Sequence, residues 1–207
     1  MNKKTITVFN FISADWKRVK NHCRTTVGKE FTENVPTADF KKKLLISEHT
    51  PIRLIEIDWS WKNIKSWVAT EWSRHKFEKF ITSQRNDRQK KYDRNKAPQD
   101  APVNFDGYAN AQNLIDAFRK RLCYCATKEA RELAEDFKAE LREERPEIAF
   151  VLQKNCIYRC GCPEFKSCGY WESFCKKHKD KNLLDINCRY VLADSDFYER
   201  KKSLRPV

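Results

Sequence analysis

Long apolar runs are missing from this chain of 207 residues, and so are internal repeats and low-complexity tracts. A membrane-spanning helix needs about 20 consecutive apolar residues, and no stretch of this sequence approaches that length. The first residues, MNKKTITVFNFISADW, carry a short apolar stretch that Ser13, Ala14 and Asp15 interrupt, which is not typical of a secretory signal. We therefore expect a cytoplasmic protein that does not associate with membranes.

The chain also lacks an even number of cysteines, since it has nine, and nine thiols cannot all pair with one another in disulfides. Without a secretory signal we expect reduced thiols or a metal site rather than a disulfide framework. Dense thiolates suit tetrahedral zinc, and the segment NCIYRCGCPEFKSC predicts a structural zinc site on Cys156, Cys160, Cys162 and Cys168. Cys175 and His178 follow this segment, and Cys123 could reach it from a preceding helix. The alternative is that these thiols are inert, small buried hydrophobes.

Charge of one sign is in excess. Lys and Arg outnumber Asp and Glu by 42 − 29 = 13, so the average field of the protein attracts anions such as nucleic acid, nucleotides, reduced folates and phosphorylated cofactors. A solvated basic surface without a specific ligand explains the same excess.

The residue patterns predict an α+β fold. Ile55, Ile57, Trp59 and Trp61 alternate along one face of a half-buried strand. Helical spacing then predicts a helix over 62–74, a second strand within 77–85, and a polar loop over 86–106. Upstream, Phe9, Phe11 and Trp16 indicate a short strand followed by a helix.

The strongest helical signal is an apolar stripe from Ala111 to Leu141, which indicates one long helix or two helices with a break near Cys123. Pro146 marks its end. We therefore expect an antiparallel or mixed sheet packed with long helices in a domain over 1–150, and a small Cys-rich C-terminal appendage over 151–207.

Two separated blocks concentrate groups that could carry chemistry. The first is Glu71-Trp72-Ser73-Arg74-His75-Lys76, followed by Ser83-Gln84-Arg85. Arginine binds phosphate bidentately and serine adds a neutral donor, so these residues could converge on an anionic ligand. The alternative is that Arg74 and Lys76 only stabilise the C-terminal end of a helix, where the dipole favours cations.

The second block, NAQNLIDAFRKRLCYCATKEAR, covers 110–131. Arg121 lies beside the apolar stripe, and a guanidinium near a buried face needs an anionic or hydrogen-bonding partner. That partner could be a ligand, or Glu129 or another carboxylate of the chain.

Together the blocks resemble the flavin-dependent thymidylate synthase (thymidylate synthase complementing protein) family. Its signatures are Arg-His-Arg followed by Ser-x-Arg, and Asn-Ala-Arg followed by Leu-Arg and Ala-Gln-x-Glu-Ile. Here they correspond to Arg74-His75-Lys76, Ser83-Gln84-Arg85, Asn110-Ala111-Gln112, Lys120-Arg121 and 126–130. Glu48-His49-Thr50-Pro51 resembles the family's segment before the first sheet strand, so the resemblance spans about 47–150.

The resemblance implies FAD-dependent reductive methylation of dUMP to dTMP, with methylenetetrahydrofolate and NADPH as co-substrates, in a homo-oligomer, a tetramer in the family. FAD would be held by Thr50, Arg74, His75, Lys76, Asn110, Gln112 and Asp116. The dUMP site would contain Glu71, Arg74, Ser83, Gln84, Arg85 and Arg121. Arg121 would act as the catalytic residue, since a fixed guanidinium stabilises charge that develops on the uracil edge.

The chain departs from the family at several positions. Lys76 stands in place of an Arg, Glu71 in place of a Gln, and Ile81 near a family Glu; a segment with a phosphate-binding Arg is absent, and Arg85, Arg88 or Arg94 could substitute for it. A divergent pyrimidine-modifying relative, of the kind viruses carry and therefore located in a host cytoplasm, is one alternative. A zinc-stabilised nucleic-acid-binding protein is another, although the tryptophans fall on apolar faces instead of beside basic residues.

Overall fold

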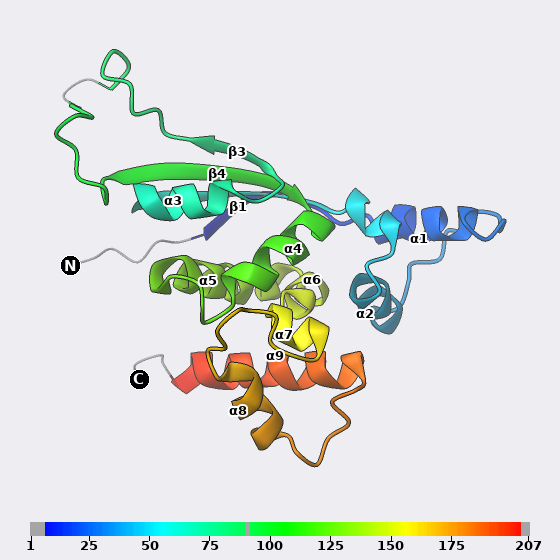
Figure 1. Ribbon diagram of the computed structural model, residues 1–207. Coiled ribbons are helices and arrows are strands. Elements are labelled where there is room, and N and C mark those ends of the chain that lie inside the picture. Colours follow the sequence, from blue (N-terminus) through cyan, green and yellow to red (C-terminus); the bar gives the residue numbers. More distant parts are fainter. Residues whose placement is uncertain (1–6, 90–91, 204–207) are drawn as a thin grey trace.

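Four antiparallel strands lie on top of a stack of helices in the computed structural model, which describes residues 7–89 and 92–203 (Figure 1). In chain order the elements are β1 Thr7–Ser13, α1 Trp16–Thr25, α2 Ala38–Ile46, the 3-10 helix η1 Thr50–Leu54, β2 Glu56–Lys65, α3 Ser66–Ser73, β3 Glu78–Ile81, β4 Pro102–Asn110, α4 Ala111–Arg121, α5 Lys128–Glu144, α6 Pro146–Val151, α7 Asn155–Arg159, α8 Tyr170–Lys177 and α9 Ile186–Ser203. Helices α3, α4 and α5 pack against the sheet, α6 packs against α5, and α7, α8 and α9 lie farther from the sheet (Figure 1).

The sheet has the strand order β1-β2-β4-β3, and every neighbouring pair is antiparallel. The predicted α+β class is therefore confirmed, with an antiparallel sheet rather than a mixed one. Ile55, Ile57, Trp59 and Trp61 are fully buried, because the period of two along an extended chain places alternate side chains on the face that the helices cover. Gly107 of β4 lies directly opposite Trp59.

The helix predicted over 62–74 is wrong at its start, because β2 continues to Lys65 and α3 begins only at Ser66. The register between β2 and β4 shifts between Trp61 and Ile64, where Asn63 has a φ of 57°. Such a bulge adds one residue to the strand, so Trp61 and Ile64 both face the core although their spacing is odd. The helical spacing of Ile64, Trp67, Val68 and Trp72 extended the predicted helix back into this strand.

The polar region between the two sequence blocks is also shorter than predicted. Strand β4 begins at Pro102, so 102–106 belong to the sheet and not to the loop that we expected over 86–106. Strand β3 covers only Glu78–Ile81 of the segment 77–85, and it pairs with 105–108 of β4. The predicted strand therefore exists, and the residues from 82 onward lie outside it.

The apolar stripe of 111–141 forms two helices, as one of the two alternatives predicted. Helix α4 ends at Arg121 and α5 begins at Lys128, with the turn around Cys123 between them. Pro146 follows the end of α5 at Glu144 and opens α6. The stripe faces the sheet, where Phe118 and Phe137 pack against each other and against the tryptophans.

Helix α9 ties the C-terminal segment to α5 through ion pairs. Lys138 is 1% exposed and lies 2.9 Å from Asp194, and Arg200 lies 2.7 Å from Glu135. Tyr190 of α9 joins the same hydrophobic cluster as the sheet residues. The division into 1–150 and 151–207 stays a prediction, and its boundary falls at the end of α6. None of the helices in 7–89 and 92–203 combines the length and hydropathy required to cross a bilayer.

Candidate functional site

The C-terminal end of α4 meets the C-terminal end of α3 at Arg121. Its guanidinium donates from Nη1 to the Glu71 carboxylate over 2.7 Å and from Nη2 to the Glu71 backbone carbonyl over 2.7 Å. Its Nε donates to Nε2 of His75 over 2.8 Å. The side chains of Arg121 and Glu71 are only 13% and 17% exposed, so the guanidinium is held in one orientation by partners from the other sequence block. Glu129, the partner named from the sequence, binds Lys65 instead, and the carboxylate that pairs with Arg121 is Glu71.

His75 is neutral in this arrangement. Burial and the positive charges of Arg121 and Lys79 lower its pKa from 6.5 to about 4, because desolvation and nearby cations disfavour the imidazolium. A neutral ring that accepts at Nε2 carries its proton at Nδ1. The ring packs against Trp72 and Phe77, and Lys79 donates to the backbone carbonyls of His75 and Phe77.

A groove of about 490 Å³ opens beside this cluster, between the loop after α3 and the start of α4. Its lining combines three cations, two aromatic rings and two amides with two carboxylates: Arg53, Lys76, Lys79, Phe77, Tyr108, Asn110, Asn113, Glu56 and Glu78. Lys76 and Asn110 come from different sequence blocks, and the fold brings both to this groove. Arg74 is exposed near Arg121, and its charge adds to the effect of burial, which is the main cause that lowers the pKa of the Arg121 guanidinium.

The helix α4 positions the polar residues of the second block. Asn110 is its N-cap, and the side-chain oxygen accepts from the backbone N–H of Asn113 over 2.9 Å. This contact satisfies a donor that the first turn of a helix leaves free. Capping thus accounts for an asparagine at this place, while Asn110 also lines the groove.

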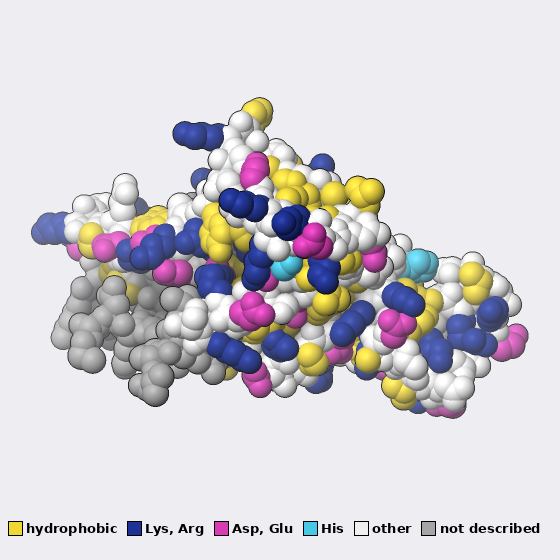
Figure 2. Space-filling view, turned by 90° about the horizontal axis from the view of Figure 1, so that it is seen from below, with side chains coloured by type: hydrophobic (Ala, Val, Ile, Leu, Met, Phe, Trp, Pro, Cys, Tyr) yellow, Lys and Arg dark blue, Asp and Glu magenta, His cyan; other side chains and the backbone are white. Residues whose placement is uncertain are grey.

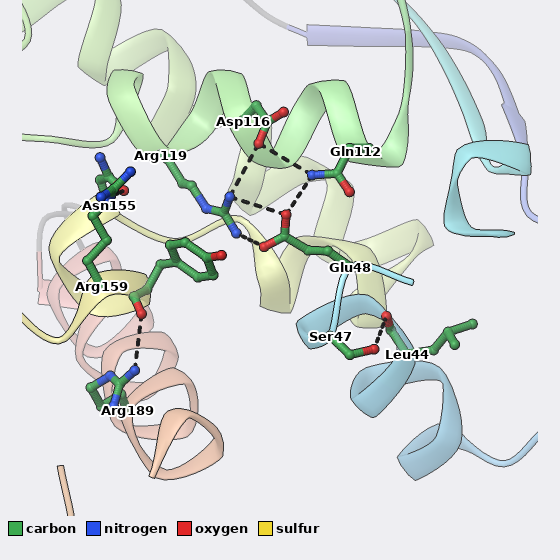
Figure 3. Close-up of polar contacts among 10 residues, drawn as sticks. Leu44, Ser47, Glu48, Gln112, Asp116, Arg119, Asn155, Arg159 and Arg189 are labelled. Atoms are coloured by element: carbon green, nitrogen blue, oxygen red, sulfur yellow. Dashed lines mark hydrogen bonds and ion pairs between the residues drawn. The ribbon is translucent and has the colours of Figure 1, made fainter. Parts of the chain in front are cut away.

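Gln112 and Asp116 lie on a side of α4 that does not line the groove, and there they form a network with Glu48 and Arg119 (Figure 3). Gln112 donates to Glu48 over 2.6 Å, and Arg119 binds both Glu48 and Asp116. The guanidinium of Arg119 also lies 3.5 Å from the ring centroid of Tyr158. Gln112 and Asp116 are thus engaged with other residues of the chain and do not line the groove that contains Asn110 and Lys76.

Sequence reasoning missed Arg119, which is buried, and missed that Glu48 is its partner. The available signal was spacing: Arg119 follows Asp116 by three and Gln112 by seven residues, so all three share one side of a helix. The sequence pattern instead indicates Arg121 as the arginine beside the buried face, because Leu122 of the apolar stripe follows it directly.

The remaining predicted site residues lie elsewhere. Thr50 is exposed at the start of η1. Ser83, Gln84 and Arg85 are exposed beyond the end of β3, and Arg85 binds Asp87 over 2.6 Å. Since Thr82 pairs with Asn104, six residues of β4 separate this end of the sheet from Asn110, which corresponds to roughly 20 Å at the rise of a strand. Among the described residues, no hydrogen bond or ion pair joins these three residues to Arg121.

The cysteines group differently from the prediction. All nine are free thiols. Among the described residues, the thiol groups of Cys123, Cys125 and Cys168 lie within 4.8 Å of one another. Of the four predicted ligands only Cys168 belongs to this group; Cys156 is buried in α7, and Cys160 ends that helix.

The basic excess does not form a single patch on the face shown in Figure 2, where Lys and Arg side chains are spread among acidic and hydrophobic ones. Trp59, Trp61 and Trp72 are fully buried, and Trp67 is half-buried. Buried tryptophans cannot stack on nucleic-acid bases, so these two observations weaken the interpretation as a nucleic-acid-binding protein.

Comparison with known proteins identifies the fold. No protein-family model matches the sequence, and no curated protein matches it either. Solved structures do match. One is thymidylate synthase X (ThyX) of Helicobacter pylori with FAD and dUMP, at a TM-score of 0.58 and 12% identity over 72% of this chain and 98% of that one. A second structure of flavin-dependent thymidylate synthase ThyX from the same organism, also complexed with FAD and dUMP, has a TM-score of 0.56 and 15% identity over 69% of this chain and 97% of that one. The chain therefore has a flavin-dependent thymidylate synthase-like fold.

Proposed function

We propose that this protein binds FAD and a pyrimidine deoxynucleotide and methylates dUMP to dTMP, with methylenetetrahydrofolate as carbon donor and NADPH as reductant. The observation that carries the proposal is the position of Arg121, held by Glu71 and His75 where the two sequence blocks meet. The solved structures that share the fold bind FAD and dUMP.

Arg121 would act on the uracil edge as a fixed cation. A guanidinium keeps its proton throughout the physiological range, so it stabilises negative charge that develops on the base without exchanging a proton with it. Three hydrogen bonds to Glu71 and His75 orient it in advance, and such preorganisation is what makes electrostatic stabilisation effective. Arg74, which is exposed beside Arg121, would contribute charge for the nucleotide phosphate.

The groove fits a flavin nucleotide by the chemistry of its side chains. Arg53, Lys76 and Lys79 offer cations for a diphosphate, and the rings of Phe77 and Tyr108 offer apolar surface for an aromatic ring system. When bound, FAD would supply the redox chemistry that the protein's own side chains lack. The protein's residues would bind and orient the reactants and keep His75 neutral beside Arg121.

A homo-oligomer, with the tetramer of the family as the expected form, would complete the site. Ser83, Gln84 and Arg85 lie beyond the end of β3, at the end of the sheet away from Asn110 and the groove, so in an assembly they would serve the site of a neighbouring copy. The outer face of the sheet supports an assembly, because Val8, Phe11 and Phe80 are 49%, 53% and 67% exposed there. Exposed apolar side chains on one face are typical of an interface.

A second candidate is a different modification of a pyrimidine nucleotide. The observation in its favour is Glu71, whose carboxylate already neutralises Arg121 at 2.7 Å. This pairing reduces the positive charge that Arg121 offers to a uracil anion, so a base with another substituent pattern would suit the site as well.

The test begins with purified full-length protein and FAD. We expect a flavin absorbance that shifts or is quenched on addition of dUMP, and dTMP detectable by mass spectrometry once methylenetetrahydrofolate and NADPH are added. A colourless protein that cannot take up FAD contradicts both candidates. A flavoprotein that responds to dUMP and yields no dTMP supports the second.

A further inference from the structure

Three thiols from distant parts of the sequence converge below α4. Cys123 and Cys125 lie in the turn between α4 and α5, and Cys168 lies in the loop between α7 and α8. Their sulfur atoms are all within 4.8 Å of one another. Four thiolates arranged tetrahedrally around zinc at about 2.3 Å have their sulfurs about 3.8 Å apart, so a small inward movement of these three side chains creates a metal site.

Burial does not explain why these residues are cysteines. Cys125 and Cys168 are exposed and Cys123 is half-buried. A cysteine that serves only as a small hydrophobe is normally among the most buried residues of a protein. Two exposed thiols beside a third gain no stabilisation from burial. Metal ligands, in contrast, must converge on a point that an ion can reach from solvent.

The loop that carries Cys168 needs an anchor. Residues 161–168 have no helix or strand, and Phe165 in this loop is fully exposed. An ion pair between Lys120 and Glu164 over 3.1 Å joins it to α4, and a contact of the Cys125 thiol with the Lys166 carbonyl over 3.6 Å joins it to the α4–α5 turn. The Lys120 and Glu164 side chains are partly exposed, and such pairs contribute at most about 1 kcal/mol.

We propose that Cys123, Cys125 and Cys168 bind one Zn²⁺ ion, with Cys162 from the same loop as the fourth ligand. Cys162 opens the loop that Cys168 closes. The same loop is held to α4 through Glu164 and Lys120 and to Cys125 through the Lys166 carbonyl, so the segment that delivers Cys168 also carries Cys162 toward the group. Binding replaces four S–H bonds with four Zn–S bonds and releases four protons to solvent. No change of oxidation state is involved.

The ion would tie the C-terminal loop to the end of α4. Cys123 follows Arg121, the last residue of that helix, by two positions. A structural zinc contributes directly to folding free energy, so the metal would stabilise the α4–α5 turn and the packing of 161–168 on it. This site does not depend on the proposed enzymatic function, because it is a closed structural site and offers no open position for substrate.

The test measures metal in full-length protein purified without chelators from zinc-supplemented cells. We expect about one zinc per chain in the wild type and loss of zinc in Cys123→Ser and Cys168→Ser. Cys23→Ser, in α1 and far from this group, is the matched control and should keep its zinc. Cys162→Ser should bind zinc more weakly than the control.

Cobalt provides a readout on the wild type alone, in case the variants fail to fold. Co²⁺ added to metal-free protein should produce the intense visible bands of tetrahedral thiolate coordination, and zinc should abolish them. Wild-type zinc no higher than in Cys168→Ser, or the absence of these bands, overturns the proposal. A disulfide among the three thiols in protein purified under reducing, anaerobic conditions also overturns it.

Discussion

Arg121 donates a hydrogen bond from Nε to Nε2 of His75 over 2.8 Å, which joins the end of α4 to the loop after α3. A protonated imidazole has no acceptor, so this bond exists only while His75 is neutral. The two residues lie 46 positions apart in the sequence, one in each of the blocks that resemble the flavin-dependent thymidylate synthases. Their contact makes the geometry of the site sensitive to pH.

Acidification is expected to loosen the site between pH 6.5 and about 4. The pKa of His75 is lowered from 6.5 to about 4 in the folded protein, so the unfolded chain binds this proton first as the pH falls. Stability that is fully present above pH 6.5 is therefore lost through this window. For a half-buried ring screened by solvent we expect a loss on the order of 1–2 kcal/mol, measured by urea unfolding at a series of pH values.

The variant His75→Gln isolates this effect, because a glutamine oxygen can accept from Arg121 and does not titrate. Protonation of carboxylates destabilises both proteins in the same acidic range. The difference between their free energies of unfolding as the pH falls therefore reports the titration of His75. Parallel pH profiles for wild type and His75→Gln would contradict the prediction.

Arg121→Ala should abolish turnover and leave FAD bound, because the proposed role of Arg121 is toward the pyrimidine. Loss of a preorganised electrostatic donor typically costs 10²- to 10³-fold in rate, so we expect turnover to fall by at least about 100-fold while flavin absorbance is retained. Arg131→Ala, on α5, is the matched control with unchanged turnover. Loss of flavin from Arg121→Ala would mean that Arg121 holds the cofactor instead.

The pair of Arg119 and Glu48 should stabilise the fold far more than a surface pair. Their side chains are 10% and 18% exposed, whereas those of Lys43 and Asp39 are 69% and 74% exposed. Arg119→Met leaves Glu48 without its main cationic partner, and breaking a buried pair costs about 3–5 kcal/mol. Lys43→Met should cost about 0.5 kcal/mol or less. Equal free energies of unfolding in the two variants would refute a special contribution from the buried pair.

Gly107→Ala should be strongly destabilising. A Cβ at Gly107 would come within 2.2 Å of the Trp59 ring, which cannot retreat because Phe77 and Phe137 pack against it. Overpacking of this kind costs typically 1–3 kcal/mol, and we expect the upper end. At Gly161 an added Cβ meets nothing within 4 Å, so Gly161→Ala is the control. In a Trp59→Leu background the cost of Gly107→Ala should shrink; a cost that is unchanged there would point to the backbone and not to the ring.

The strand face of Ile55, Ile57, Trp59 and Trp61 was predictable because alternation of large apolar residues has one structural meaning in an extended chain. The end of this strand and the start of α3 were not predictable. A bulge at Asn63 shifts the register against β4, and local periodicity does not contain that non-local pairing. Strand β4 was not predicted for a related reason: Gly107 interrupts the apolar alternation of Val103, Phe105 and Ala109, and its partner Trp59 fills the space.

The sequence by itself determined the two blocks, their order and the apolar stripe that becomes α4 and α5, because these depend on residue type and short-range spacing. Only the tertiary structure decided which polar groups meet. It placed Glu71 and His75 on Arg121, turned Gln112 and Asp116 toward Glu48 and Arg119, left Ser83, Gln84 and Arg85 at the other end of the sheet, and gathered Cys123 and Cys125 with Cys168. Contacts between residues far apart in the chain follow from how the sheet and helices pack, and a linear pattern does not carry that information.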